Sequence, residues 1–168
     1  CDWSSDVCSS DLLVAQDLTA FGSDRSEKLV ELLRRLDAEK AASWIRLLYA
    51  YPVGVDDDLL SAIVDLPSVC DYLDVPLQHA SEDVLRAMKR PIGRFGSRRF
   101  VEYVRSTAPA IKIRTTFIVG FPGETEKDIQ DLENLVAEGH FESVGVFTYS
   151  PEPGTPACDM TGQVPEKE

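Results

Sequence analysis

The feature that most constrains the fold is a regular alternation of short apolar segments with amphipathic ones. Segments that read as strands are 13–15, 44–50, 72–75, 111–119 and 143–148. Apolar residues recur at helical spacing in the segments 26–40, 56–66, 82–89, 97–107 and 126–138. Short apolar strands separated by helices pair in parallel and are covered on both faces. The sequence therefore predicts an α/β fold with parallel strands, as a (β/α) barrel, part of one, or an open sheet.

Several helix ends carry recognisable capping signals. Thr125 is expected to cap the segment 126–138, with Asp128 in the capping-box position, and Gly139 is expected to end it. Ser81 is the expected N-cap of 82–89. These signals are local, so they predict where helices begin and end more firmly than how they pack.

Composition narrows the class of protein. The chain has 168 residues, a formal net charge of −12 and 43% hydrophobic residues, which suits one globular domain. No apolar run approaches the ~20 residues of a membrane span, and no secretory signal precedes the first strand, so we expect a cytoplasmic protein without membrane contact. An acidic chain is a poor general binder of nucleic acid and suits a basic partner.

The two ends differ from the alternating middle. Residues 1–12 are rich in serine and aspartate, show no period, and read like a translated sequencing adapter, so we expect a non-native tail. A genuine polar tail is the alternative. Residues 158–168 are rich in proline and charge and are expected to be a linker. The four cysteines, Cys1, Cys8, Cys70 and Cys158, show no metal or redox spacing and are expected to be free thiols.

Ligands of parallel α/β folds bind at the carboxyl ends of the strands, and one such end is unusual here. The sequence GFPGE, residues 120–124, joins an apolar strand directly to a helix. Glycine permits positive φ and close approach of another group, whereas Pro122 stiffens the turn and holds Phe121 extended. Such a turn can offer backbone amides and carbonyls to a flat heterocycle. A tight connection without a ligand is the alternative.

Other polar residues near strand ends allow two interpretations each. His79 is more often a hydrogen-bonded structural residue than a base or ligand. The pair at positions 16 and 17 is either a site contact or a turn cap. Arg114 and Thr116 share one face of a strand, where an arginine needs an acidic partner or a ligand carboxylate. The basic group is expected to form a solvated face, with a contact to an acidic or nucleic-acid partner as the alternative. It consists of Arg86, Lys89, Arg90, Arg94, Arg98 and Arg99.

Five ordered blocks resemble the radical SAM methylthiotransferases. They read LVAQDLTAFG, WIRLLYAYP, YLDVPLQHASEDVLRAMKRP, IRTTFIVGFPGETEKDI and VGVFTYSPEPGTPA, and run from Leu13 to about Ala157. The wording of LLYAYP, DVPLQHAS and RTTF is most similar to the members that modify an aspartate of small-subunit ribosomal protein twelve. The members that modify tRNA are the second reading, and a non-catalytic barrel remnant that binds a partner is the third.

The resemblance implies a fold and a set of cofactors. The fold would be the later part of a partial (β/α) barrel, with residues 13–157 as the C-terminal portion of the radical SAM core and a TRAM domain beyond the linker. S-adenosylmethionine and 4Fe-4S clusters would be the cofactors, and an electron donor and the ribosomal protein would be the partners. The cluster motif C-x-x-x-C-x-x-C does not occur in this chain, so we predict that the chain alone cannot cleave S-adenosylmethionine.

The resemblance also implies a site. The GFPGE segment would lie beside the adenosyl group, and positions 78, 79 and 81 would face the ribose and methionine parts. Positions 114 and 116 would point into the barrel, 149 and 150 would lie near the adenine edge, and 16 and 17 near the methionyl amino end. The implied cofactor-binding residues are Gln16, Asp17, Gln78, His79, Ser81, Arg114, Thr116, Gly120, Phe121, Pro122, Gly123, Glu124, Tyr149 and Ser150.

Overall fold

The structure is a computed structural model that describes residues 11–22, 27–90 and 96–164. The strands are β1 (Asp11–Val14), β2 (Ile45–Leu48), β3 (Tyr72–Asp74), β4 (Lys112–Val119) and β5 (Ser143–Thr148). The α-helices are α1 (Leu29–Ala38), α2 (Asp57–Asp65), α3 (Glu82–Ala87), α4 (Gly96–Thr107) and α5 (Glu126–Ala137). Three short 3-10 helices are η1 (Leu18–Ala20), η2 (Pro52–Gly54) and η3 (Pro156–Asp159).

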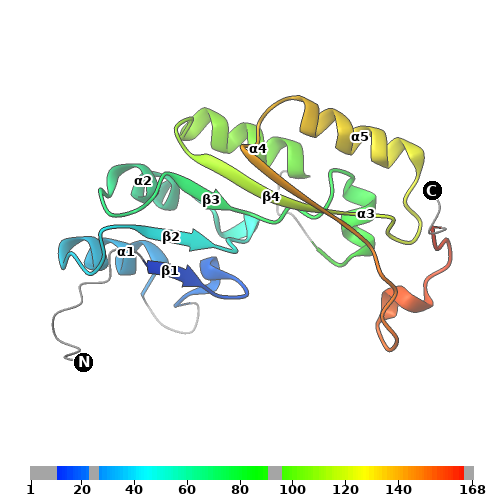
Figure 1. Cartoon of the computed structure of the whole chain (residues 1–168), viewed down its shortest axis with the longest axis horizontal. Helices are drawn as coiled ribbons and strands as arrows, with labels where there is room; N and C mark the ends of the chain where they lie inside the picture. Colours follow the sequence, from blue (N-terminus) through cyan, green and yellow to red (C-terminus); the bar gives the residue numbers. More distant parts are fainter. Residues whose placement is uncertain (1–10, 23–26, 91–95, 165–168) are drawn as a thin grey trace.

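The strand pairs in the described residues are all parallel, as predicted. β1 pairs with β2 in one sheet, and β3, β4 and β5 pair in that order in a second. A bridge between Ile45 and Val69, and a hydrogen bond of 2.8 Å from the Ala50 N–H to the Asp74 carbonyl, join the two sheets. Figure 1 shows the strands crossing the molecule in chain order. A parallel sheet whose strand order follows the chain without reversal has the arrangement of a (β/α) barrel wall.

The helices form where the sequence places apolar stripes and caps. In α5 the Thr125 N–H donates to the Asp128 carboxylate at 2.9 Å, and the Asp128 N–H donates back to the Thr125 hydroxyl at 3.4 Å, which confirms the predicted capping box. Gly139 follows α5 with φ +73°, as the end signal predicted. Ser81 caps α3, and Asp56 caps α2 through its carboxylate.

The strands have two distinct faces. Along β4 the residues Ile113, Thr115 and Phe117 are fully buried against the helices, and they belong to or border the main core. The alternate residues Arg114 and Thr116 are only partly buried. We call the side of the strands that carries Arg114 and Thr116 the inner face. It is the side that would line the interior of a barrel.

Several boundaries differ from the sequence-based prediction. β1 begins at Asp11, two residues earlier than expected and inside the segment assigned to the tail, because strand pairing uses backbone groups that any residue provides. The origin of residues 1–10 stays a prediction, since they lie outside the described residues. α1 begins at Leu29, where Lys28 is its N-cap. No helix in the described ranges is long and apolar enough to cross a membrane.

The segment after β5 is more ordered than the predicted linker. It contains η3, and the Gly123 N–H donates to the Gly162 carbonyl at 2.8 Å. The Gln163 side chain donates to the Ala157 carbonyl at 3.0 Å and so closes the segment on itself. The chain up to residue 164 therefore folds back onto the GFPGE turn, which composition could not indicate.

Candidate functional site

The GFPGE turn (residues 120–124) is a two-glycine turn held from within. Gly120 and Gly123 have φ of +78° and +84°, which glycine adopts at little cost. The Glu124 N–H donates to the Phe121 carbonyl at 2.9 Å and closes a turn with Pro122 and Gly123 in the middle. This is the residue order that a type II β-turn requires. The glycines are thus needed for the backbone path itself.

Glu124 supports the turn from inside. Its side chain is 4% exposed, and its carboxylate accepts the Gly120 N–H at 3.0 Å and the Phe121 N–H at 3.4 Å. The Gly123 N–H is bonded to Gly162. These three amides therefore have internal partners, and the contact of this turn with a flat heterocycle stays a prediction.

His79 lies behind the turn and not on an open surface. The ring is fully buried, its Nδ1 accepts the Ser81 N–H at 2.9 Å, and its Nε2 is 3.4 Å from the Glu124 carboxylate. Burial lowers the pKa of His79, while the neighbouring Glu124 and Asp128 carboxylates oppose that effect. His79 is held through Nδ1, whereas its buried Nε2 faces Glu124 without a hydrogen-bond partner among the described residues. Both interpretations of His79 therefore stay open.

Ser81 is likewise used within the protein. Its hydroxyl accepts the Val84 N–H at 3.5 Å as the cap of α3. Burial raises the pKa of Asp128, but hydrogen bonds from Ser81 and Thr125 outweigh it and hold that pKa below its ordinary value. Ser81 and His79 therefore anchor the start of α3 to the start of α5.

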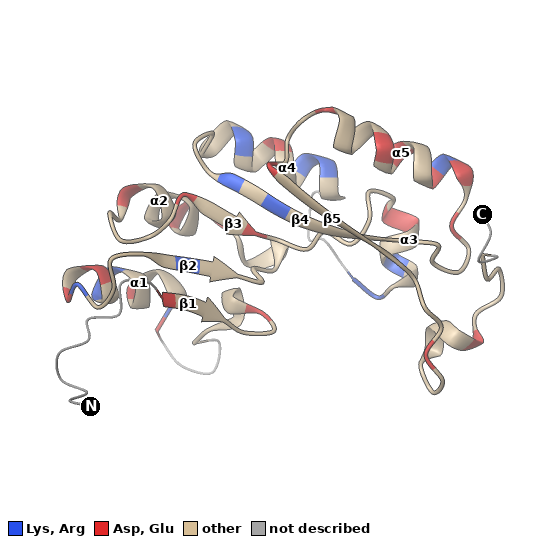
Figure 2. Cartoon of the chain, viewed as in Figure 1, with Lys and Arg blue, Asp and Glu red and all other residues tan. Residues whose placement is uncertain are grey.

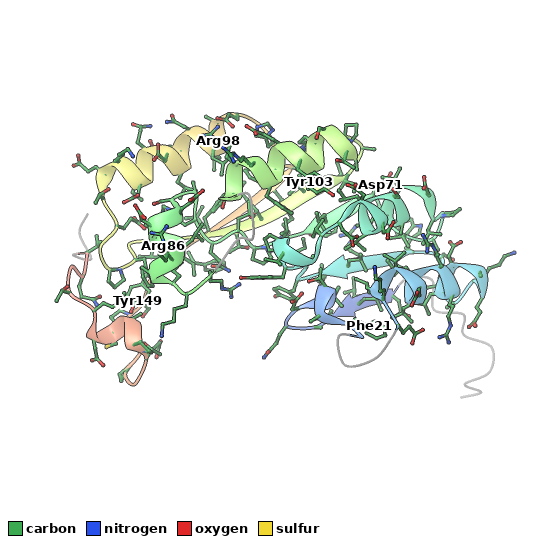
Figure 3. All side chains as sticks on the ribbon, turned by 180° about the vertical axis from the view of Figure 1, so that it is seen from behind. Phe21, Asp71, Arg86, Arg98, Tyr103 and Tyr149 are labelled. Carbon is green, nitrogen blue, oxygen red and sulfur yellow. The ribbon has the colours of Figure 1, made fainter. Side chains whose placement is uncertain are left out.

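Two polar side chains flank the carboxyl end of β4 without a partner. Gln78 bridges to Phe117 on one side of β4, with φ +71°, which a non-glycine residue seldom adopts. On the other side, the Tyr149 N–H donates to the Val119 carbonyl at 2.8 Å, and its ring packs edge-on against Phe121 at 5.2 Å. Gln78 Oε1 and the Tyr149 hydroxyl are buried and have no hydrogen-bond partner among the described residues. Figure 3 shows Tyr149 beside the segment that holds η3.

The remaining expected positions divide between caps and open surface. The Asp17 carboxylate accepts the Thr19 N–H at 2.9 Å and the Thr19 hydroxyl at 2.5 Å, so it caps η1. Of the two interpretations of this pair, the turn cap is the one observed for Asp17. Gln16 and Ser150 are exposed.

The sequence did not single out Asp74, which organises the inner face. Arg114 Nη1 donates to Asp74 Oδ1 at 2.8 Å, and the Tyr49 N–H donates to Asp74 Oδ2 at 3.2 Å. The acidic partner expected for Arg114 is therefore Asp74. An acid at the last residue of the neighbouring strand was the available signal, but only the strand register places it opposite Arg114. Thr116 lies beyond Arg114 on the same face.

The basic group is largely a solvated surface, as expected. Arg86 pairs with Asp83 at 2.5 Å within α3, and Arg98 pairs with Glu138, joining α4 to α5. Figure 2 shows basic positions interspersed with acidic ones along the helices, and Figure 3 shows Arg98 between α4 and α5. Arg94 lies outside the described residues. Two members of the group, Arg86 and Arg98, thus form ion pairs within and between helices.

The described part of the chain has no metal site of its own. Within it, no cluster of three or more His, Cys, Asp or Glu side chains could hold a metal ion. Cys70 and Cys158 are free thiols, as predicted, whereas Cys1 and Cys8 lie outside the described residues. The side chains described here therefore do not fit the ligand set of a 4Fe-4S cluster.

Sequence relatives share most of this chain. It is 46% identical over 155 residues to the ribosomal protein uS12 methylthiotransferase RimO of Desulforamulus reducens. The matched region covers 91% of this chain and 35% of that protein. The RimO protein of Moorella thermoacetica is 49% identical over 158 residues, 93% of this chain and 37% of its own length. The chain thus spans about a third of the length of the curated relatives it matches.

Solved structures share the fold. A radical S-adenosylmethionine methyltransferase, TsrM from Kitasatospora setae, matches with a TM-score of 0.64 at 16% identity, over 89% of this chain and 29% of that one. Coproporphyrinogen III oxidase (HemN) of Escherichia coli matches with a TM-score of 0.59 at 19% identity, over 83% of this chain and 32% of that one. The model of the radical SAM superfamily matches residues 19–136, well over half of the sequence. The chain therefore belongs to the radical SAM superfamily.

Proposed function

We propose that this chain is the S-adenosylmethionine-binding part of an enzyme that methylthiolates an aspartate side chain of ribosomal protein uS12. The observation that carries the proposal is the identity of 46–51% to proteins named as uS12 methylthiotransferases, over 91–93% of this chain. In this proposal, residues 13–157 are the C-terminal portion of the radical SAM core. The cysteines that bind the cluster would lie elsewhere in the longer protein.

The residues present fit an adenosyl group. Gln78 Oε1 and the Tyr149 hydroxyl are buried polar atoms without partners among the described residues, and they flank the GFPGE turn on both sides. Buried polar atoms left unpaired are costly, so a ligand that bonds them is a physical reason for their position. When bound, S-adenosylmethionine supplies the hydrogen-abstracting and methyl-donating chemistry.

The chain's own residues would orient this ligand and exclude water. The Glu124 carboxylate fixes the turn by accepting hydrogen bonds from two of its N–H groups. The His79 ring packs next to this carboxylate, with Nε2 3.4 Å away. The Phe121 and Tyr149 rings form an apolar contact at the same end of β4. A site held by buried bonds keeps a reactive group in one geometry, which is what reaction selectivity requires.

The partners follow from the same assignment. The formal net charge of −12 suits association with a basic ribosomal protein, because complementary charge favours encounter. A cytoplasmic location and a protein electron donor are part of the proposal. No contact with a membrane or with free nucleic acid is needed for it.

The test is an assay of the full-length protein that carries this chain, with its clusters reconstituted. Purified uS12 and S-adenosylmethionine are supplied with a reductant, and the mass of uS12 is followed. We expect the mass increase of one methylthio group on a single aspartate. Transfer RNA in place of uS12 is the matched control and should stay unmodified.

Two results would contradict the proposal. Modification of tRNA but not of uS12 would assign the chain to the other branch of the family. Modified uS12 produced by residues 1–168 alone would show that the described chain needs no further cluster ligands. We expect the chain alone to be inactive.

A further inference from the structure

The inner face carries an excess of positive charge. By strand alternation, its charged members among the described strand residues are Arg46, Asp74, Lys112 and Arg114. Three of the four are cations, although the whole chain has a formal net charge of −12. A local positive surface in an acidic protein favours an anionic ligand at that surface.

Of these cations, Arg114 is the one that a hydrogen bond holds against a buried carboxylate on the same face. The Arg46 guanidinium lies over the Tyr72 ring at 4.6 Å, and Lys112 is 3.8 Å from Glu142. Arg114 Nη1 donates to Asp74, and no second hydrogen-bond acceptor for its guanidinium occurs in residues 11–22, 27–90 or 96–164. A guanidinium has five N–H donors, so most of the group remains available.

The orientation of Arg114 is fixed by a buried partner. Asp74 is 1% exposed at its side chain, whereas Arg114 is 39% exposed, so one end of the pair is anchored and the other reaches open space. Asp74 is itself held by the Tyr49 N–H, and Tyr49 has φ +63°, an uncommon value for tyrosine. A guanidinium held in this way is preorganised to bind a carboxylate through two parallel hydrogen bonds.

Arg114 is well separated from the GFPGE turn. It lies six positions before Gly120 on β4, which corresponds to about 20 Å along an extended strand. In register it is level with the last residue of β3, and Asp74 is bonded to Ala50 just beyond β2. The two positions could therefore bind different ligands on one face, with a nucleoside at the turn and a carboxylate at Arg114.

We propose that Arg114 binds the side-chain carboxylate of the aspartate that is modified on uS12, with Asp74 as its positioning residue. This inference rests on the proposed function, because it takes the substrate from it. The carbon that is modified is adjacent to that carboxylate, so a two-point contact would fix its position relative to the cofactor. The carboxylate of S-adenosylmethionine has the same chemistry, and the experiment must separate the two.

The test uses the full-length protein with reconstituted clusters and three forms of it: unchanged, Arg114→Gln and Arg114→Lys. We expect Arg114→Gln to lower kcat/KM for uS12 by about 10- to 100-fold, the value of a charge-assisted hydrogen bond or two. The KM for S-adenosylmethionine and its cleavage without uS12 should change less than about twofold. Arg114→Lys keeps the charge but loses the planar fork, so its kcat/KM should lie between the other two.

A matched change on the substrate separates a direct contact of Arg114 with the target carboxylate from a purely structural role of Arg114. The dissociation constant of uS12 is measured with its target aspartate and with asparagine at that position. The unchanged enzyme should bind the aspartate form about tenfold more tightly, and Arg114→Gln should bind both forms equally. If Arg114→Gln fails to fold, the Arg114→Lys protein and the substrate exchange still test the contact.

Each contrary result has one meaning. A raised KM for S-adenosylmethionine in Arg114→Gln would assign the residue to the cofactor carboxylate and overturn the inference. Equal binding of both uS12 forms by the unchanged enzyme, with modification intact, would also overturn it while leaving the proposed function standing. Absence of any binding or modification of uS12 by the unchanged enzyme would reject the proposed function, and this inference with it.

Discussion

The two faces of β4 show opposite uses of one strand. On the helix-facing side, Ile113, Thr115 and Phe117 are fully buried, and even the threonine has its hydroxyl bonded. On the inner face, the Arg114 side chain is 39% exposed and Thr116 is only partly buried. Because side chains alternate along a strand, neighbouring residues can serve packing and ligand binding independently. The difference indicates that the helix face contributes more to the stability of this fold than the inner face does.

The largest expected effect is the loss of a ring from the helix face. Phe117→Ala should lower the free energy of unfolding by about 3–5 kcal/mol, because it opens a cavity in the core beside Phe141. Ile118→Ala, one residue along and on the inner face, should cost much less. Urea denaturation of both variants measures this. Equal losses would show that the inner face is as tightly packed as the helix face.

A pair of adjacent threonines tests the polar side of the same comparison. The Thr115 hydroxyl donates to the Val75 carbonyl at 2.9 Å and accepts the Leu77 N–H at 3.2 Å. Thr115→Val should cost about 1–3 kcal/mol, since it leaves buried backbone groups unpaired. Thr116→Val should leave the unfolding free energy nearly unchanged. A loss in Thr116→Val as large as in Thr115→Val would contradict the distinction between the faces.

Two glycines in the segment after β5 test how closely that segment packs on the turn that follows β4. A Cβ on Gly162 would approach the Gly123 nitrogen to 3.2 Å, and its φ is +80°. Gly154 has a similar φ of +86° but open space around it. Each change to alanine should cost about 1 kcal/mol for the backbone alone, and Gly162→Ala should cost more.

Hydrogen exchange at one amide identifies the cause of that difference. The Gly123 N–H is bonded to the Gly162 carbonyl at 2.8 Å, so its protection should fall in Gly162→Ala and persist in Gly154→Ala. Unchanged protection in both variants would argue against a seated C-terminal segment.

The smallest expected effect is on the pH dependence of the unfolding free energy, and it tests the buried His79 beside the GFPGE turn. Burial lowers the pKa of His79, so below about pH 6.5 the unfolded chain binds a proton that the folded chain resists. The unfolding free energy should therefore fall as the pH drops from about 7.5 to 5.5, and His79→Gln should reduce that fall. His140→Gln, at a partly exposed histidine, is the control. An unaltered pH slope in His79→Gln would remove His79 as the cause.

The sequence by itself determined the order and type of the main elements. Capping residues such as Thr125 and Asp128, and end signals such as Gly139, act within a few residues, so local chemistry was sufficient to predict them. The alternation of strands and helices likewise predicted parallel pairing, because short crossovers through helices leave no other pairing. The short 3-10 helices were missed, since their few residues give no periodic signal.

Tertiary structure decided which polar groups meet. Arg114 and Asp74 are forty positions apart, and only the register of β3 against β4 brings them together. Glu124 reads as part of a ligand loop in the sequence, but folding turns its carboxylate inward onto the amides of its own turn and toward His79. The left-handed backbone of Gln78, with φ +71°, has no sequence signal, because glutamine is not a residue type that favours this region. Local propensity acts over a few residues, whereas these contacts depend on packing across the whole sheet, and that is why the sequence could not indicate these internal bonds.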